Sequence, residues 1–138
     1  MSYENPWYYE GQIVESDVLE TYVGFVYNIT NLTNNKQYIG KKLLRKTKTK
    51  QVKGKKKRSL VESDWKAYYG SNKELQEDVI QMGTSNFKRE ILYLCKSKAE
   101  CSYIEAREQF SRKVLESDEY YNGHIQVRVH GSHIKSKL

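Results

Sequence analysis

Several features are scarce in this 138-residue chain, and each scarcity narrows the possible class of protein. No apolar run approaches the roughly 18–20 residues that a membrane-spanning helix needs. The opening residues, MSYENPWYYEG, lack a signal-peptide pattern. Cysteine is limited to Cys95 and Cys101, which favours a reduced setting over a disulfide framework. We therefore expect a soluble, intracellular protein that does not span a membrane.

Acidic residues are missing from one stretch. Between Lys41 and Arg58 the chain has eleven lysines or arginines and no Asp or Glu. The whole chain carries a net charge of +7, so the remainder, with 13 basic and 17 acidic residues, carries −4. A mildly acidic body with one basic segment indicates an electrostatic contact made by a single loop. DNA or RNA is the natural partner, because neutralised phosphates release counterions. A solvated loop, a localisation signal or an acidic-membrane contact are the alternatives.

The chain length suits one domain with its own core. Residues 1–20 hold the single proline, Pro6, and are predicted to be a poorly regular lead-in. The domain proper is expected over residues 21–130, with a basic insertion at 41–60 and a tail at 131–138. The many lysines and Gly54 predict that the insertion lacks stable structure when nothing is bound.

The pattern within the domain predicts an α/β (α+β) fold of order ββ-αα-β-α, with a three-stranded antiparallel sheet flanked by helices. The expected elements are strands at Tyr22–Thr30 and Lys36–Lys42, a short helix at 62–70, a helix at Asn72–Met82, a strand at Phe87–Cys95, a helix from Ser97 or Lys98 to about Leu115, and a last short strand at Ile125–Val129.

The first two strands each carry a tyrosine beside a glycine. Gly24 precedes Tyr27, and Gly40 follows Tyr38. Pairing of the strands as a hairpin brings the two phenols together. Aromatic packing is the ordinary explanation in a chain with twelve tyrosines. However, a hairpin that only packs does not require hydroxyls at both positions, so the pair suggests chemistry.

These residues resemble the GIY-YIG nuclease superfamily. Gly24-Phe25-Val26-Tyr27 is similar to its first motif, with one extra residue, and Tyr38-Ile39-Gly40 matches its second. Over roughly residues 22–130 the chain resembles compact, stand-alone phage members related to homing endonucleases. The resemblance implies a metal-dependent endonuclease that hydrolyses DNA with Mg²⁺ or Mn²⁺. It also implies location in the cytoplasm of a bacterial host if the gene is phage-borne.

Glu108 is the predicted metal ligand. Glu108 lies at the edge of an apolar helix face, near Ile104 and Leu115, and Glu105 points into water. On a helical wheel this apolar face is defined by Tyr103, Ala106, Phe110 and Val114. One carboxylate with several waters is a plausible Mg²⁺ arrangement. The run Arg107-Glu108-Gln109-Phe110 also resembles the catalytic-glutamate helix of the family. The alternative is a surface ion pair between Glu108 and Arg112.

Tyr27 and Tyr38 are the candidates for general base and for orienting water or phosphate. An unperturbed tyrosine has a pKa near 10, so a phenolate needs nearby positive charge. Strand alternation places Lys42 on the face of Tyr38 and Lys41 on the other face, which favours Lys42. Asn122 matches the asparagine that closes the motif set of the family and is expected to support the site.

The family normally places an arginine on the helix that follows the second motif. Here Arg58 or Lys66 is the candidate substitute for binding the phosphate. Tyr69 occupies a position where relatives carry a histidine or a tyrosine. The predicted nucleic-acid-binding residues are Lys41, Arg45, Lys46, Lys48, Lys50, Lys53, Lys55, Lys56, Lys57 and Tyr69.

Other functions stay open at this stage. His124, His130 and His133 do not form a recognised zinc spacing with the two cysteines. The alternative to a nuclease is a non-catalytic DNA- or RNA-binding module on the same scaffold, and an RNA-directed enzyme is a third possibility. The protein could act on DNA as a monomer or a dimer.

Overall fold

A computed structural model describes residues 3–135, so the ends of the predicted lead-in and tail (residues 1–2 and 136–138) lie outside the described residues. Its strands are β1 (Trp7–Tyr9), β2 (Gln12–Ile13), β3 (Gly24–Asn31), β4 (Lys36–Leu43), β5 (Arg45–Val52), β6 (Lys55–Glu62) and β7 (Phe87–Cys95). Its helices are α1 (Lys73–Met82), α2 (Lys98–Ser111) and the 3₁₀ turns η1 (Ser16–Glu20), η2 (Trp65–Ala67), η3 (Thr84–Asn86), η4 (Val114–Glu116) and η5 (Gly131–His133).

The main sheet has five strands in the order β2-β1-β7-β3-β4. Strand β3 lies between β7 and β4 and pairs antiparallel with both. The mixed α/β class, the β3–β4 hairpin and the β7 strand are therefore confirmed. The expectation of three strands is wrong, because β1 adds to β7 in parallel and β2 pairs with β1.

Strand β1 lies in the stretch that was predicted to be poorly regular. Its Trp7 is fully buried, and the indole Nε1 donates a hydrogen bond of 2.7 Å to the Trp65 carbonyl. The guanidinium of Arg89 lies 4.7 Å from the centre of the Trp7 ring. Burial of one large aromatic side chain, with its N–H satisfied, fixes a strand of only three residues to the sheet.

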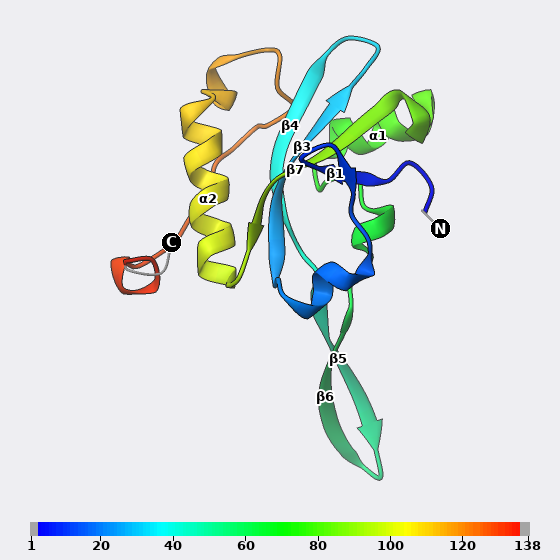
Figure 1. Cartoon of the computed structure of the whole chain (residues 1–138), viewed down its shortest axis with the longest axis vertical. Coiled ribbons are helices and arrows are strands. Elements are labelled where there is room, and N and C mark those ends of the chain that lie inside the picture. Colours follow the sequence, from blue (N-terminus) through cyan, green and yellow to red (C-terminus); the bar gives the residue numbers. More distant parts are fainter. Residues whose placement is uncertain (1–2, 136–138) are drawn as a thin grey trace.

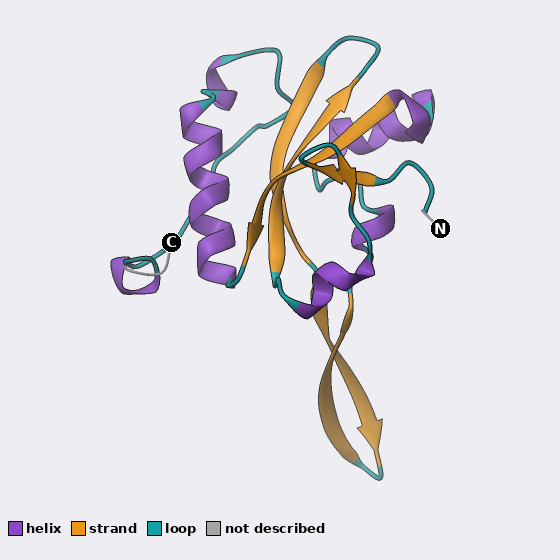
Figure 2. Ribbon diagram, viewed as in Figure 1, coloured by secondary structure: helices purple, strands orange, loops and turns teal. Residues whose placement is uncertain are grey.

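Helices cover both faces of the sheet. Helix α2 packs on one face and α1 on the other, as the ribbon views show (Figures 1 and 2). The core on the α2 face contains Val26, Ile39, Cys95, Cys101, Ile104 and Val114. The core on the α1 face is aromatic and includes Trp7, Phe25, Tyr27, Trp65, Leu75 and Phe87. Strand β4 forms one edge of the sheet, so side chains from both faces of the sheet can meet beside it.

The helices begin at the capping residues that the sequence indicates. Asn72 accepts a hydrogen bond from the amide of Leu75, and Ser97 accepts one from the amide of Glu100. Helix α2 ends at Ser111, four residues before the predicted end, because Lys113 takes a left-handed conformation with φ 54°. The predicted helix at 62–70 is only the single turn η2.

Residues 125–129 do not form the predicted last strand. Within residues 3–135, neither α-helix has the length and apolar character that crossing a bilayer requires.

Strands β5 and β6 form a two-stranded ribbon, here called the basic hairpin (Arg45–Glu62), which projects away from the body (Figure 1). The prediction that this segment lacks stable structure is wrong for the described structure. Its tip is the two-residue turn Lys53-Gly54, with φ of 51° and 77°. Positive φ at both positions is the geometry of a type I′ turn, which suits the twist of a tight hairpin.

Candidate active site

A polar cavity of about 270 Å³, here called the edge cavity, opens beside strand β4. It is lined by Tyr38, Lys41, Ser71, Asn72, Glu105, Gln109, Asn122, Gly123, His124 and Gln126. Ser71 and Asn72 come from the α1 side of the sheet, whereas Glu105 and Gln109 come from α2. These side chains meet because β4 is an edge strand around which both layers reach.

The two motif tyrosines lie next to each other, as predicted. Tyr38 lines the edge cavity, and its hydroxyl is 3.1 Å from Oγ of Ser71. Tyr27 lies on the neighbouring strand with its ring centre 6.1 Å from that of Tyr38. The Tyr27 side chain is fully buried, and its hydroxyl has no hydrogen-bond partner among the described residues.

Gly40 allows the two strands to hold these phenols. It is the direct cross-strand partner of Tyr27. A Cβ atom at Gly40 would overlap the Tyr27 hydroxyl and come within 2.6 Å of Cζ of the same ring. The glycine of the second motif is thus required by the close approach of Tyr27 to the β4 backbone.

Both phenols are held in the neutral form. Burial, with smaller effects of the Tyr68 and Tyr38 phenols, raises the pKa of Tyr27 well above its ordinary value of 10. Burial also raises the pKa of Tyr38, although the hydrogen bond with Ser71 opposes the rise. A neutral phenol is a hydrogen-bond donor, so the geometry does not provide the phenolate that a tyrosine general base needs.

Lys42 does not line the edge cavity. Its Nζ lies 2.7 Å from Oδ1 of Asp64 and 4.1 Å from the centre of the Tyr68 ring. The cation that lines the cavity is Lys41, whose Nζ donates to Oγ of Ser102 at 2.6 Å. Strand alternation does place Lys42 on the face of Tyr38, but the cavity opens around the edge of the sheet, so sharing a face with Tyr38 does not decide access.

The carboxylate in the edge cavity belongs to Glu105 and not to Glu108. Glu108 pairs with Arg112 at 3.5 Å, which is the alternative that the sequence left open. The predicted apolar face is wrong in part, because Tyr103 and Phe110 are exposed although Ala106 and Val114 are buried. Helix α2 instead buries Cys101, Ile104 and Gln109, which turns Glu105 toward the cavity.

The Glu105 carboxyl is half-buried, and burial raises its pKa above the ordinary value. The charges of Lys41 and His124 lower the pKa and partly offset this effect. A desolvated carboxylate is stabilised by a nearby positive charge, so Glu105 is suited to holding a cation.

Two amide side chains fix the cavity wall to strand β4. The Asn122 side chain accepts a hydrogen bond from the Ile39 amide at 3.1 Å and donates one to the Ile39 carbonyl at 2.8 Å. Gln109 donates to the same carbonyl at 3.0 Å. The buried Oε1 of Gln109 has no partner among the described residues. Asn122 therefore holds the β4 backbone through two hydrogen bonds, and Gln109 holds it through a third.

Comparison with known proteins identifies the family of the chain. A family model described as "Putative endonuclease segE, GIY-YIG domain" matches residues 7–125. The chain belongs to the segE-type GIY-YIG nuclease family. The "Putative endonuclease segE" of Enterobacteria phage T4 is 33% identical over 98 residues, which are 71% of this chain and 39% of the phage protein. The chain thus spans about two fifths of the length of that relative. No solved structure matches it.

The basic residues that were predicted to replace the family arginine lie outside the edge cavity of this GIY-YIG domain. Arg58 is on the exposed basic hairpin opposite Thr49. Lys66 lies over the rings of Tyr3 and Trp65, at 5.4 and 5.6 Å. No arginine of the described residues lines the cavity, and Lys41 is the cation that reaches it.

The predicted nucleic-acid-binding residues divide by location. Lys41 lines the edge cavity, and the others, apart from Tyr69, lie on the basic hairpin. Tyr69 instead packs in the body, where its hydroxyl accepts a hydrogen bond of 2.9 Å from Asn5 and Arg89 stacks 4.2 Å from its ring centre.

GIY-YIG nucleases generally use divalent metal ions, and the edge cavity fits such an ion. It holds the Glu105 carboxylate and is also lined by Gln109, whose buried Oε1 has no partner among the described residues. Among residues 3–135 no group of three metal-binding side chains occurs. A single carboxylate suits Mg²⁺ or Mn²⁺, since a hard cation keeps several waters and takes its remaining oxygens from substrate phosphate.

Sequence reasoning missed Glu105, His124 and Ser71 as cavity residues, and it preferred Lys42 to Lys41 as the cation near the phenols. A signal for Glu105 was available, because Cys101 and Ile104 are apolar residues of the same helix that lie outside the predicted apolar face. No local pattern marks His124 or Ser71, since each reaches the cavity only through the tertiary fold.

Proposed function

We propose that this protein is a divalent-metal-dependent endonuclease that hydrolyses DNA phosphodiester bonds in the edge cavity. The observation that carries the proposal is the meeting of Tyr38, Lys41 and Glu105, from two different elements, in one polar cavity of a GIY-YIG fold. The basic hairpin beside it supplies the positive charge that a polyanionic substrate requires.

Each cavity residue has a role that its chemistry supports. Glu105, with Gln109 beside it, would hold the ion, and a bound ion neutralises phosphate charge and lowers the pKa of coordinated water. Lys41 provides a point charge for the phosphate as negative charge develops on it. Tyr38, kept neutral, donates a hydrogen bond that orients the phosphate or the attacking water. His124 is the imidazole that lines the cavity and is the candidate for proton transfer.

Tyr27 has a positioning role in this proposal. Its hydroxyl packs against Gly40 and has no exposed surface, so it does not contact substrate in the described conformation. It fixes the ring of Tyr38 and the backbone of β4, and thereby the wall of the edge cavity.

The test is a plasmid-nicking assay with a matched pair of variants on α2, Glu105→Ala and Glu108→Ala. The purified wild-type protein should nick supercoiled plasmid with Mg²⁺ or Mn²⁺ and not with EDTA. Glu105→Ala should reduce the rate at least about a hundredfold, as removal of one essential electrostatic group does. Glu108→Ala should keep the rate within about threefold, since it loses only a surface ion pair. Equal rates for both variants, or cleavage in EDTA, would refute the mechanism.

A non-catalytic DNA- or RNA-binding module is the second candidate. The observation that favours it is the absence of an arginine from the described lining of the edge cavity. This candidate predicts salt-sensitive binding by the wild type and by Glu105→Ala alike, with no nicking under any metal. Competition between duplex DNA and RNA in the same binding assay separates the two substrates.

A further inference from the structure

The two faces of the basic hairpin carry different chemistry. Directly paired residues of an antiparallel ribbon share a face, and the faces alternate along each strand. The register of β5 and β6 therefore assigns every side chain. One face, here called the lysine face, carries Lys46, Lys48, Lys50, Val52, Lys55, Lys57, Ser59 and Val61. The other, here called the Thr/Arg face, carries Arg45, Thr47, Thr49, Gln51, Lys56, Arg58, Leu60 and Glu62.

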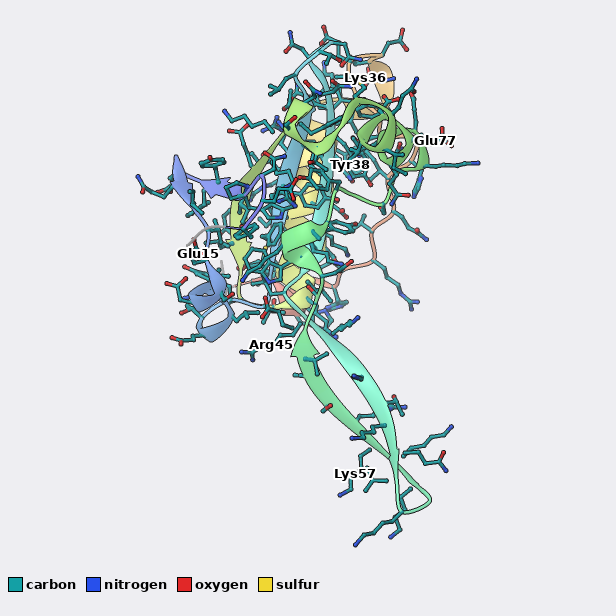
Figure 3. All side chains as sticks on the ribbon, turned by 90° about the vertical axis from the view of Figure 1, so that its right-hand side faces the viewer. Glu15, Lys36, Tyr38, Arg45, Lys57 and Glu77 are labelled. Carbon is teal, nitrogen blue, oxygen red and sulfur yellow. The ribbon has the colours of Figure 1, made fainter. Side chains whose placement is uncertain are left out.

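The hairpin contains charge repulsion that an anion would relieve. Lys50 and Lys57 are direct cross-strand partners, and like charges at such positions destabilise a ribbon. Nearly all side chains of both strands are exposed (Figure 3), so the lysines do not serve to pack a core. The first acidic residue of the hairpin is Glu62 at its base. This arrangement is complementary to a partner with regularly spaced negative charges.

We propose that the basic hairpin lies in the major groove of duplex DNA, with the Thr/Arg face on the base edges and the lysine face serving the phosphates. The proposal rests on the proposed function in that it takes DNA as the substrate. It goes further by assigning sequence readout to specific residues, namely Thr49, Gln51 and Arg58.

The dimensions and the side chains agree with this placement. The major groove, about 12 Å wide, admits a two-stranded ribbon. Strands of eight residues extend roughly 26 Å at about 3.3 Å per residue, enough to follow several base pairs. Arginine pairs bidentately with guanine, glutamine with adenine, and the threonine methyl contacts the methyl of thymine. Lysine lacks this fork and acts as a point charge.

The opposite face is placed to reach the sugar–phosphate walls. The groove is about 8.5 Å deep, so the outward face of an inserted ribbon lies close to the level of the phosphates. The flexible four-carbon stems of lysine can extend sideways to both walls. The lysine-rich outer face would make the phosphate contacts that position the protein. The inner face, with its arginine and glutamine side chains, would make the base contacts that read the sequence.

A basic route connects the hairpin to the edge cavity. A second cavity, of about 490 Å³, lies at the hairpin base, and Lys41 lines both cavities. The basic residues around this second cavity are Lys41, Lys42, Arg45, Lys46 and Lys98. Tyr38 lies on the body and Arg45 where the hairpin leaves it, with Lys57 toward the far end (Figure 3). A backbone strand leaving the groove can therefore follow positive charge to Glu105.

The experiment uses neighbouring residues on opposite faces as matched pairs, Gln51→Ala against Lys50→Ala and Arg58→Ala against Lys57→Ala. Each full-length protein, in EDTA to withhold the metal, selects from a randomised duplex library whose bound fraction is sequenced. The wild type should enrich a preferred sequence. Gln51→Ala and Arg58→Ala should lose the preference at one or two adjacent positions and bind the enriched duplex roughly ten- to a hundredfold more weakly.

The lysine variants should behave differently. Lys50→Ala and Lys57→Ala should keep the same enriched sequence, bind all duplexes more weakly, and lower the slope of log affinity against log salt by about one each. Three outcomes overturn the proposal: a wild-type library without base preference, Thr/Arg-face variants that keep the full preference, or lysine-face variants that change it.

Plasmid nicking by the wild type distinguishes the two proposals. Nicking with no base preference refutes the readout alone, whereas base preference without nicking refutes the nuclease alone.

Discussion

At the scale of single residues, Glu105 combines a stability cost with the proposed function. Burial raises its pKa, so the folded state holds this proton more tightly than the unfolded chain does. The ionised carboxylate therefore lowers stability, and the loss grows as pH rises from the ordinary range of glutamate through the raised pKa. Above the raised pKa, and without metal, the full penalty is present.

Glu105→Gln is accordingly expected to melt at a higher temperature than the wild type at pH 7 in EDTA. The difference should shrink as pH falls toward 4, because the wild-type carboxyl becomes protonated. Thermal denaturation across this pH range measures the effect. Glu108→Gln, the control on the same helix, should be unchanged or slightly less stable, since it loses the ion pair with Arg112. A Glu105→Gln protein that is less stable at pH 7 would contradict the desolvation argument.

Gly40→Ala should destabilise the protein by about 1–3 kcal/mol, because the new methyl overlaps the Tyr27 ring. Urea unfolding gives the free energy of unfolding. Gly123→Ala is the control, since nothing lies within 4 Å of a Cβ at that position. Equal stability of the two variants would show that the β3–β4 contact is looser than described.

The residue-level predictions from sequence succeeded where one strand pair decided the outcome. The closeness of Tyr27 and Tyr38 followed from the hairpin, and it is confirmed at 6.1 Å between the ring centres. Glu105 was missed because a helical wheel weighs apolar residues, whereas α2 buries Gln109 to bond the Ile39 carbonyl. Hydrogen bonding to a buried backbone group outweighed the hydrophobicity of Phe110, and composition cannot show this.

At the scale of elements, β1 gives the N-terminal stretch a structural role. Trp7 packs against Phe25 at 4.9 Å and Tyr27 at 5.2 Å between ring centres. Trp7→Ala should therefore cost about 3–5 kcal/mol of unfolding free energy, the usual range for a buried tryptophan. Tyr8→Ala, one residue away and half-buried, should cost clearly less. Chemical denaturation of both proteins measures the free energy of unfolding. A small decrease for Trp7→Ala would show that the N-terminal stretch contributes little to stability.

The basic hairpin shows why an element can be missed although its signal is present. Thr47 and Thr49 alternate with lysines, and Lys53-Gly54 stands at the centre of the two runs. These are strand and turn features. The density of positive charge favoured a disordered loop, and charge density outweighed the turn signal in that prediction. Strand β1 was missed for a different reason, since a three-residue strand carries no periodicity of its own.

At the scale of the whole molecule, the basic hairpin carries the excess positive charge and the body does not. Replacing residues 46–61 by a short Gly-Ser turn changes the net charge from +7 to −1. The ends can be joined, because the Ser63 amide donates to the Leu44 carbonyl at 2.8 Å. The shortened protein should remain folded and lose at least about a hundredfold in DNA affinity at low salt, since the remaining body has no net attraction for phosphate.

Circular dichroism and filter binding test these two expectations separately. Loss of the fold would show that the hairpin stabilises the body. Affinity within a few fold of the wild type would place the DNA contact elsewhere on the molecule.

The passage from β4 into β5 is very short. Only Leu44 separates the strands, and it is fully buried with its amide bonded to the Val23 carbonyl at 2.9 Å. Strand β4, which carries Tyr38 and Lys41, therefore continues almost directly into the basic hairpin. Such a short linkage would fix the distance between the edge cavity and the basic hairpin. The phosphodiester that is broken should then lie at a constant offset, in base pairs, from the sequence that the basic hairpin contacts.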